Sequence, residues 1–310
     1  MTAYIDRSYP FLEIITSPDW QDYELLDSGN GQKLERFGGF RLIRPEAEAI
    51  WSPALSQKEW KKVDAIFHPT PEENGGHWQH LTSIPERWTL AYKNLKFYVQ
   101  TTASRHVGVF PEQASQWDWI VEQVRTHKGE CRILNLFGYT GLASLAAASA
   151  GAQVTHLDAS RKVVSWARDN QILSKLEKCP LRWIVDDALK FVQREARRES
   201  RYDGIILDPP KFGRGPKGEV WEFYKLLPIL LKACRAILSE QPAFMILTAY
   251  AVKASAVTLY NALNEIMQPL HGKLQAGEIA LIETSAERLL PTAIFARWSR
   301  THHNLHPLED

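Results

Sequence analysis

The most constraining feature of this chain is a regular alternation of apolar, strand-like runs with helical patterns, which begins near residue 131. Short runs rich in Ile, Leu, Val and Phe occupy 131–137, 154–159, 182–185, 203–208 and 243–249, and a helical segment follows each one. Such alternation predicts an α/β fold with a parallel sheet and right-handed crossovers. Two later runs, 277–283 and 292–298, have only a short connection between them, which predicts an antiparallel hairpin at one sheet edge.

Candidate functional residues follow the ends of the predicted strands, where ligands bind in open α/β sheets. The first strand is followed by a glycine turn, 135–141, in which Gly138 and Gly141 allow a ligand to approach the backbone closely. Asp158 ends the second strand, and a carboxylate at that place is suited to a ribose diol. Asp186 and Asp187 follow the third strand, and the fourth ends in the Asp-Pro-Pro-Lys-Phe motif of 208–212.

Each of these features also has a plainer interpretation. A glycine turn with an acid after the second strand occurs in many nucleotide-binding folds and identifies none of them. Asp187 alone is more often a helix cap, and Asp-Pro-Pro alone is a loop start. It is the ordered combination at four strand ends that favours a site for a cofactor and an acceptor.

The first 115 residues differ in composition from the rest. Seven of the eleven tryptophans lie before residue 120, and 1–115 carries a net charge of −3, whereas 116–310 carries +4. Turn signals at 27–31 and 38–39 separate short strand-like runs, and an alternating run covers 95–102. We therefore expect a small, mainly β domain over 1–115, with a possible role in substrate recognition, and an α/β domain over 116–310.

Composition excludes several classes of protein. The formal charge of the whole chain is +1, so a strongly basic coat for nucleic acid is absent, although a local basic patch is compatible with it. Apolar runs are too short for a membrane span, and the acidic N-terminal segment is unlike a signal peptide. Three cysteines without a CxxC motif predict neither disulfides nor a cysteine-rich zinc site. We expect a cytoplasmic protein without a metal; His68, His77 and His80 favour a solvated loop over a metal site.

The stretch 131–298 resembles the class I S-adenosylmethionine-dependent methyltransferases. More narrowly, NLFGYTG, AAASAGA, VTHLDAS, DDALKF and LDPPKF resemble the RlmI/RlmK-type large-subunit ribosomal-RNA methyltransferases, as does the segment 108–113. The resemblance covers roughly 190 residues, and 1–100 lack that family's N-terminal RNA-binding pattern. It implies a Rossmann-like sheet of order 3-2-1-4-5-7-6 with an antiparallel seventh strand, and S-adenosylmethionine as the cofactor.

The resemblance also implies roles for residues at the strand ends. The glycine turn would hold the methionine end of the cofactor, Asp158 the ribose, and Asp187 with Ala188 the adenine. The expected cofactor-binding residues are Asn135, Phe137, Gly138, Tyr139, Thr140, Gly141, Asp158, Ala159, Ser160, Asp187, Ala188 and Asp208. The expected catalytic residues, which would meet the methyl acceptor, are Asp208, Pro209, Lys211 and Phe212.

The expected acceptor is a nitrogen of a nucleobase, with RNA, and ribosomal RNA in particular, as the expected partner. Methylation at cytosine C5 requires a cysteine thiolate, and no cysteine follows the fourth or fifth strand. A methyltransferase for proteins or small molecules remains an alternative. A nicotinamide oxidoreductase would predict GxGxxG after the first strand, where this chain has Gly138-x-x-Gly141, and it would give the DPPKF motif no role. A non-catalytic binding protein is disfavoured by the intact set of residues at the strand ends.

Overall fold

The computed structural model describes residues 11–17, 20–70 and 75–301. The predicted strands of the α/β part are present, and those of the edge hairpin are longer than expected. They are β9 (Arg132–Leu136), β10 (Gln153–Asp158), β11 (Leu181–Val185), β12 (Gly204–Leu207), β15 (Phe244–Ala249), β16 (Gly272–Ile282) and β17 (Leu289–Arg300).

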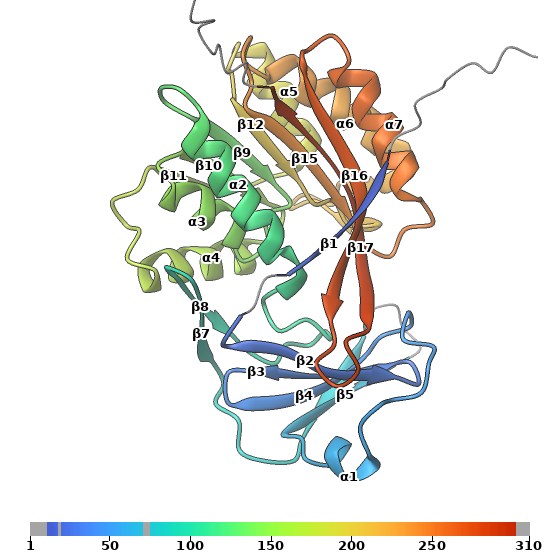
Figure 1. The fold of residues 1–310 in the computed structure, drawn as a ribbon. Coiled ribbons are helices and arrows are strands. Elements are labelled where there is room, and N and C mark those ends of the chain that lie inside the picture. The colour runs from blue at the N-terminus through green and yellow to red at the C-terminus, as the bar shows by residue number, and fades with distance from the viewer. Residues whose placement is uncertain (1–10, 18–19, 71–74, 302–310) are drawn as a thin grey trace, which may run out of the picture.

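These strands join in one sheet with the order β16-β17-β15-β12-β9-β10-β11 (Figure 1). Numbered along the α/β part, this order is 6-7-5-4-1-2-3. The strands β9, β10, β11, β12 and β15 are parallel, and β17 pairs antiparallel with both β15 and β16. This is the topology that the resemblance implied.

Helices cover both faces of this sheet. On one face lie α5 (Ala188–Arg197), α6 (Phe223–Ile237) and α7 (Ala256–Met267); on the other lie α2 (Ala114–Thr126) and α3 (Leu142–Ser149). Side chains of β9 alternate between the two cores, Ile133 on the α2–α3 side and Leu134 on the α5–α7 side. Strands buried on both faces read as continuous apolar runs, which explains why the sequence identified them.

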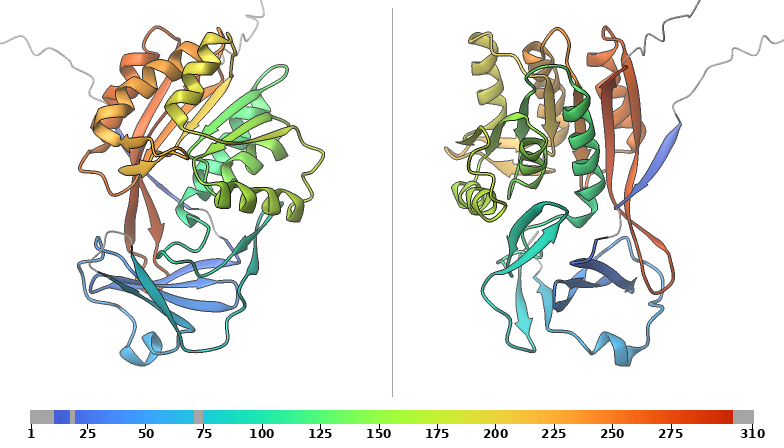
Figure 2. Two further views of the ribbon diagram at one scale, coloured as in Figure 1. Left: turned by 180° about the vertical axis from the view of Figure 1, so that it is seen from behind. Right: turned by 60° about the vertical axis from the view of Figure 1, so that its left-hand side comes forward.

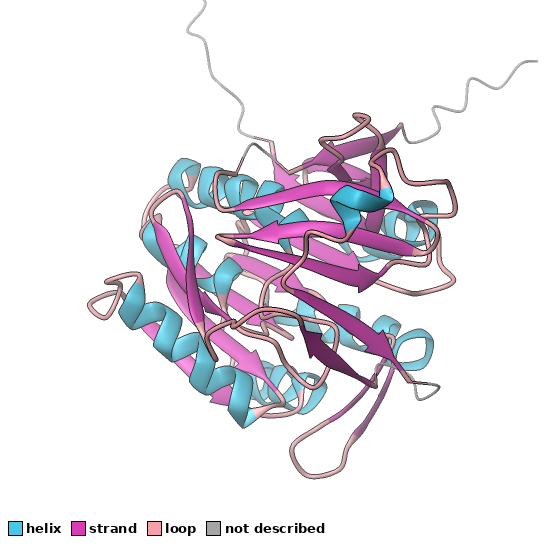
Figure 3. Cartoon of the chain, turned by 90° about the horizontal axis from the view of Figure 1, so that it is seen from below, coloured by secondary structure: helices cyan, strands magenta, loops and turns pink. Residues whose placement is uncertain are grey.

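The N-terminal part is built from strands. A five-stranded sheet contains β2 (Tyr23–Gly29), β3 (Gln32–Phe37), β4 (Phe40–Pro45), β5 (Ala65–Pro69) and β6 (Gly76–His80), and β7 (Trp88–Tyr92) pairs with β8 (Leu95–Val99). In the described residues 20–99 it holds one short helix, α1 (Gln57–Trp60), as the view from this end shows (Figure 3). The small, mainly β fold expected here is present.

Two connections between the parts were not expected from the sequence. The strand β1 (Leu12–Thr16) leaves the N-terminal part and pairs parallel with β16, as an eighth strand of the α/β sheet. Conversely, the tip of the β16–β17 hairpin extends to the N-terminal sheet, where Glu283 bridges to Leu25 (Figures 1 and 2). Since β16 runs parallel to β15, the N-terminal part lies at the carboxyl ends of the parallel strands, the edge that binds ligands.

The segment that follows Asp-Pro-Pro-Lys is rich in glycine. It forms a small antiparallel hairpin of β13 (Phe212–Arg214) and β14 (Val220–Glu222), because Phe212 pairs with Glu222 and Arg214 with Val220. Among the described residues, no helix has both the length and the apolarity required to cross a membrane.

Candidate active site

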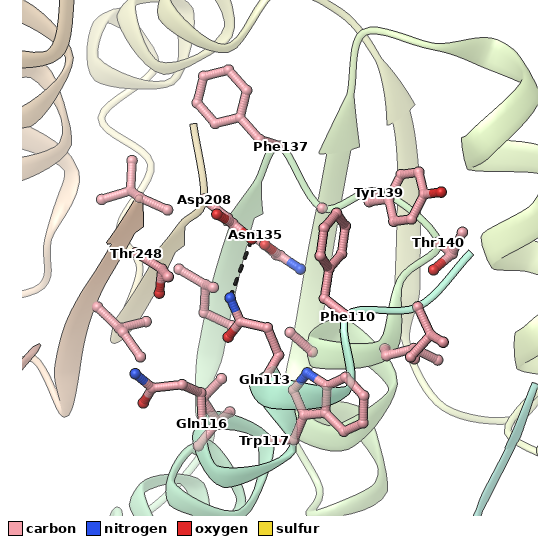
Figure 4. A pocket seen from close by; sticks show the side chains of 18 residues that line it. Phe110, Gln113, Gln116, Trp117, Asn135, Phe137, Tyr139, Thr140, Asp208 and Thr248 are labelled. Atoms are coloured by element: carbon pink, nitrogen blue, oxygen red, sulfur yellow. Dashed lines mark hydrogen bonds between the residues drawn. The ribbon is translucent and has the colours of Figure 1, made fainter. Parts of the chain in front are cut away.

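A cavity lies at the carboxyl ends of β9, β12 and β15 (Figure 4). Its floor comes from Asn135, the glycine turn, Asp208 and Thr248. The cavity is covered by residues that precede α2 and by residues of its first turn. These are Phe110, Gln113, Gln116 and Trp117. The cavity therefore joins the predicted cofactor turn to the predicted acceptor motif.

The glycine turn has an unusual backbone. Phe137 and Tyr139 both have left-handed conformations, with φ of 58° and 50°. Such backbone is held in place by its surroundings: the Phe137 ring packs on Trp221, and the Tyr139 ring packs edge-on against Phe110. Gly138 is required for space, since a Cβ there would lie 2.3 Å from the ring of His156.

Below the turn is a buried polar chain. The amide of Asn135 donates to Ser144 Oγ at 2.9 Å, and that hydroxyl contacts His156 Nδ1 at 2.9 Å. Burial lowers the pKa of His156 to about 3, so this imidazole is neutral at physiological pH. We interpret the chain as support for the turn, since His156 lies beneath Gly138.

Asp158 fastens the glycine turn to the end of β10. Its two carboxylate oxygens accept from the backbone N–H groups of Tyr139, at 3.0 Å, and Ser160, at 2.9 Å. Each carboxylate oxygen has two lone pairs, so each can still accept a hydroxyl hydrogen. Asp158 is part-exposed, as a ligand contact requires.

The two acids after β11 have other partners. Asp187 caps α5, because its carboxylate accepts from the backbone N–H of Lys190 at 2.9 Å. Asp186 forms an ion pair with Arg194. Capping uses one acceptor of Asp187 and leaves others for a ligand. The structure therefore shows that Asp187 caps a helix, and this role is compatible with an additional contact to a ligand.

Asp208 is the half-buried acid of the cavity. The Gln113 amide donates to its Oδ2 at 3.3 Å and to the hydroxyl of Tyr250 at 2.9 Å. Burial, together with the nearby charge of Glu112, raises the pKa of Asp208 to about 8. Burial also raises the pKa of Glu112 itself. Asp208 and Glu112 are therefore two acids in surroundings shielded from water, and the charge of Glu112 disfavours ionisation of Asp208.

The rest of the DPPKF motif lies outside the cavity lining. Pro209 is buried, while Lys211 is exposed and Phe212 retains 53% of its surface. Trp221 anchors the following hairpin, donating from its indole N–H to the Pro210 carbonyl at 2.7 Å and packing on Phe137. An exposed aromatic ring therefore stands on a firm base next to the site.

Of the predicted residues, the cavity collects Asn135, Phe137, Gly138, Tyr139, Thr140 and Asp208. The others, at neighbouring strand ends or beyond, are Gly141, Asp158, Ala159, Ser160, Asp187, Ala188, Pro209, Lys211 and Phe212. Sequence reasoning missed Phe110, Gln113, Gln116, Trp117 and Thr248 as lining residues, and Glu112 and Tyr250 as their neighbours. The only sequence signal for these residues was the resemblance of 108–113 to the methyltransferase family, and it covers Phe110, Glu112 and Gln113 alone.

The cysteines and the N-terminal histidines are elsewhere. Cys234 is buried within α6, and Cys131 precedes β9 at the amino end of the sheet, opposite to the cavity. His68 and His77 stack on each other in the β5–β6 pair, and the short segment 71–74 between those strands lies outside the described residues. None of the three cysteines lines the cavity.

Together, the doubly wound sheet, the glycine turn and the strand-end acids define an α/β enzyme that binds a nucleotide-type cofactor. A family model described as S-adenosylmethionine-dependent methyltransferase matches residues 7–244. The chain belongs to this family of S-adenosylmethionine-dependent methyltransferases.

Solved structures share this fold. A SAM-dependent methyltransferase from Agrobacterium tumefaciens is 45% identical, with a TM-score of 0.89 over 93% of this chain and 94% of that one. A putative methyltransferase in complex with SAH, 18% identical, has a TM-score of 0.70 over 89% of this chain and 75% of that one.

Curated relatives are longer proteins. The ribosomal RNA large subunit methyltransferase K/L of Hahella chejuensis is 35% identical over 71% of this chain and 29% of its own length. That of Pseudoalteromonas translucida is 32% identical over 53% of this chain and 21% of its own length. This chain thus matches less than a third of these relatives.

Features of the site fit an adenosyl cofactor. The part-exposed Asp158, beside the glycine turn, has spare lone pairs for the hydroxyls of a ribose. In addition, the buried Nε2 of Gln116, in the lining, lacks a hydrogen-bond partner among the described residues. A polar ligand group would satisfy it.

Proposed function

We propose that this methyltransferase methylates a nitrogen of a nucleobase in RNA, with ribosomal RNA as the expected substrate. The names of the curated relatives support the RNA class. The observation that carries the proposal is Asp208, a half-buried carboxyl group in the cavity that is followed by an exposed aromatic residue, Phe212.

In this proposal the cofactor lies along the strand ends. Residues 137–141 hold its methionine end with Asn135 beneath them, Asp158 with Ala159 and Ser160 holds the ribose, and Asp187 with Ala188 meets the adenine. Bound S-adenosylmethionine supplies an activated methyl group on a sulfonium. The protein then has to position the acceptor in line and exclude water, for which the cover of Phe110 and Trp117 is suited.

Asp208 and the carbonyl of Pro209 would accept the hydrogens of an exocyclic amine, so that the nitrogen lone pair points at the methyl group. The N–C bond would form as the methyl–sulfur bond of the sulfonium breaks, leaving a neutral thioether, and Asp208 would take the proton that the amine loses. A pKa near 8 makes this carboxylate a stronger base than an ordinary one. Gln113, bonded to the same carboxyl group, would hold its orientation.

Outside the cavity, Phe212 would stack on the base, which has to leave its own stack to reach the methyl group. Lys211, Arg214 and Lys217 accompany it on or near the β13–β14 hairpin and would meet phosphates. The absence of a cysteine from the cavity lining supports a nitrogen acceptor over cytosine C5.

A labelled transfer assay tests the proposal. The enzyme, given S-adenosylmethionine with a labelled methyl group, is incubated with RNA, protein and small-molecule fractions, and labelled RNA is digested to nucleosides for mass spectrometry. We expect an N-methylated base. Label in protein or small molecules would support the alternative acceptors, and 5-methylcytidine, or a thiol adduct with a fluorinated cytosine, would refute a nitrogen target.

A further inference from the structure

A cluster of His127, Cys131 and Asp203 lies at the amino-terminal edge of the sheet, at the end opposite to the active site. Their ligand atoms, an imidazole nitrogen, a sulfur and a carboxylate oxygen, all lie within 4.8 Å of one another. We propose that these three side chains bind a zinc ion, which ties the end of α2 to the starts of β9 and β12.

The backbone brings the three residues together from distant parts of the chain. His127 is the C-cap of α2, its N–H donating to the Gln123 carbonyl at 3.2 Å, and Gly129 at φ +89° turns the chain back towards Cys131. β9 and β12 are neighbouring parallel strands, so the residues that precede them, Cys131 and Asp203, lie side by side. The convergence follows from the topology.

The donor set is suited to zinc. Thiolate, imidazole and carboxylate are the usual protein ligands of Zn²⁺, at about 2.0–2.3 Å, which places two ligands of a tetrahedral ion roughly 3.3–3.8 Å apart. The three ligand atoms lie within 4.8 Å of one another, so small side-chain rotations would bring them to these distances. Three protein ligands leave a fourth position for water.

The arrangement also leaves room for an ion. Among the described residues, no hydrogen bond or ion pair joins the three side chains to one another, although all three converge. The Asp203 carboxylate is oriented from behind, because the backbone N–H of Arg132 donates to its Oδ2 at 2.9 Å, which leaves the other oxygen for a metal.

Cys131 is shielded by the apolar core around Ile120, Val124 and Ile133. Burial, together with the charge of Asp203, raises the pKa of its thiol to about 12. The thiol is therefore neutral without a metal, and binding would release its proton as the zinc–sulfur bond forms. Shielding from solvent would then protect that bond.

Cobalt(II) is the probe, because it occupies zinc sites and reports its ligands by absorbance. The full chain is reduced, freed of metal with a chelator and titrated. We expect one equivalent of Co²⁺ to bind, with the visible bands of tetrahedral cobalt and a thiolate charge-transfer band in the near ultraviolet, and we expect Zn²⁺ to displace it.

Variants identify the ligands. His127→Ala, at a half-buried position, removes a proposed ligand and should weaken Co²⁺ binding at least about tenfold. Asp203→Asn, which still accepts from Arg132, should also weaken it, and Cys131→Ser should remove the charge-transfer band. Cys179→Ser is the matched control and should change neither property. No band in the wild type, or an unchanged titration of His127→Ala, would overturn the proposal.

Discussion

Asp208 combines a half-buried position in the cavity with a raised pKa, and the proposed chemistry requires its carboxylate form. Asp208→Ala should lower the single-turnover rate of methyl transfer by roughly 10²-fold or more, with S-adenosylmethionine affinity within a few-fold, because the lost contact acts on the acceptor. Asn should be milder, since its oxygen still accepts. If Asp208 only caps the loop, Ala would instead lower cofactor affinity and melting temperature together.

The raised pKa of Asp208 adds a pH dependence. In the unfolded chain this carboxyl group ionises near its ordinary value, and in the folded enzyme near 8. The folded state therefore binds more protons in between, and stability should fall as the pH rises from about 4 to 8. Asp208→Asn should flatten this slope and be more stable than the wild type at neutral pH, as equilibrium unfolding would show. An unchanged slope would contradict the burial of an ionisable Asp208.

Activity should have the opposite pH dependence. If the carboxylate is the base, kcat/KM should rise with pH and level off above about 8, since kcat/KM reports the free enzyme. Asp208→Asn should be flat over the same range. A wild-type rate that falls through pH 8 would exclude the carboxylate as the active form.

Asp158 is the residue expected to select the cofactor. Asp158→Ala should weaken S-adenosylmethionine binding by about 1–3 kcal/mol, or roughly 5- to 150-fold, because ribose hydroxyls lose their acceptor. The loss includes the bonds to Tyr139 and Ser160, so Asp158→Asn, which keeps one acceptor oxygen, is the comparison. Equal calorimetric affinity of wild type and Ala variant would remove Asp158 from the site.

At the scale of elements, the β13–β14 hairpin carries two aromatic residues with different expected roles, Phe212 in acceptor binding and Trp221 in stability. Exposed Phe212 is expected to touch the acceptor, so Phe212→Ala should weaken RNA binding by about 1–3 kcal/mol at an unchanged melting temperature, and Phe212→Tyr should restore it. Buried Trp221 supports the hairpin, so Trp221→Ala should cost about 3–5 kcal/mol of stability. Equal RNA binding by wild type and Phe212→Ala would rule out stacking.

At the scale of the whole molecule, a buried polar network joins the two parts. Glu283, fully buried at the tip of the β16–β17 hairpin, accepts from Arg288 at 2.6 Å and from Ser285 at 2.6 Å, and it also bonds to Ser28 of β2. Asp27, next to Ser28, accepts from Arg288 and Ser285 as well. This network holds the N-terminal part at the carboxyl edge of the sheet.

Glu283→Gln should therefore destabilise the fold by about 1–3 kcal/mol, less than a fully buried pair would cost because Arg288 is part-exposed. Cofactor affinity should stay unchanged. Glu278→Gln, at an exposed position on β16, is the control, and denaturant unfolding measures both. Equal midpoints would show that the network does not hold the parts together.

The sequence by itself determined the local elements and their class. Continuous apolar runs such as 204–207 and 244–249 mark strands buried on both faces, and the acids and glycines at the ends of the strands mark the ligand edge, because strand ends are local features. The resemblance then predicted the strand order. These inferences need only neighbours in the sequence and a family pattern.

Only the tertiary structure decided which distant residues meet. β1 joins the sheet beside β16, Gln113 bonds to Asp208, and Cys131 approaches Asp203, and no periodicity along the chain encodes these pairs. The raised pKa of Asp208 has the same origin, since desolvation and the charge of Glu112 depend on what the fold packs around the carboxyl group. Short-range patterns specify elements, whereas burial and long-range contacts arise only when those elements pack.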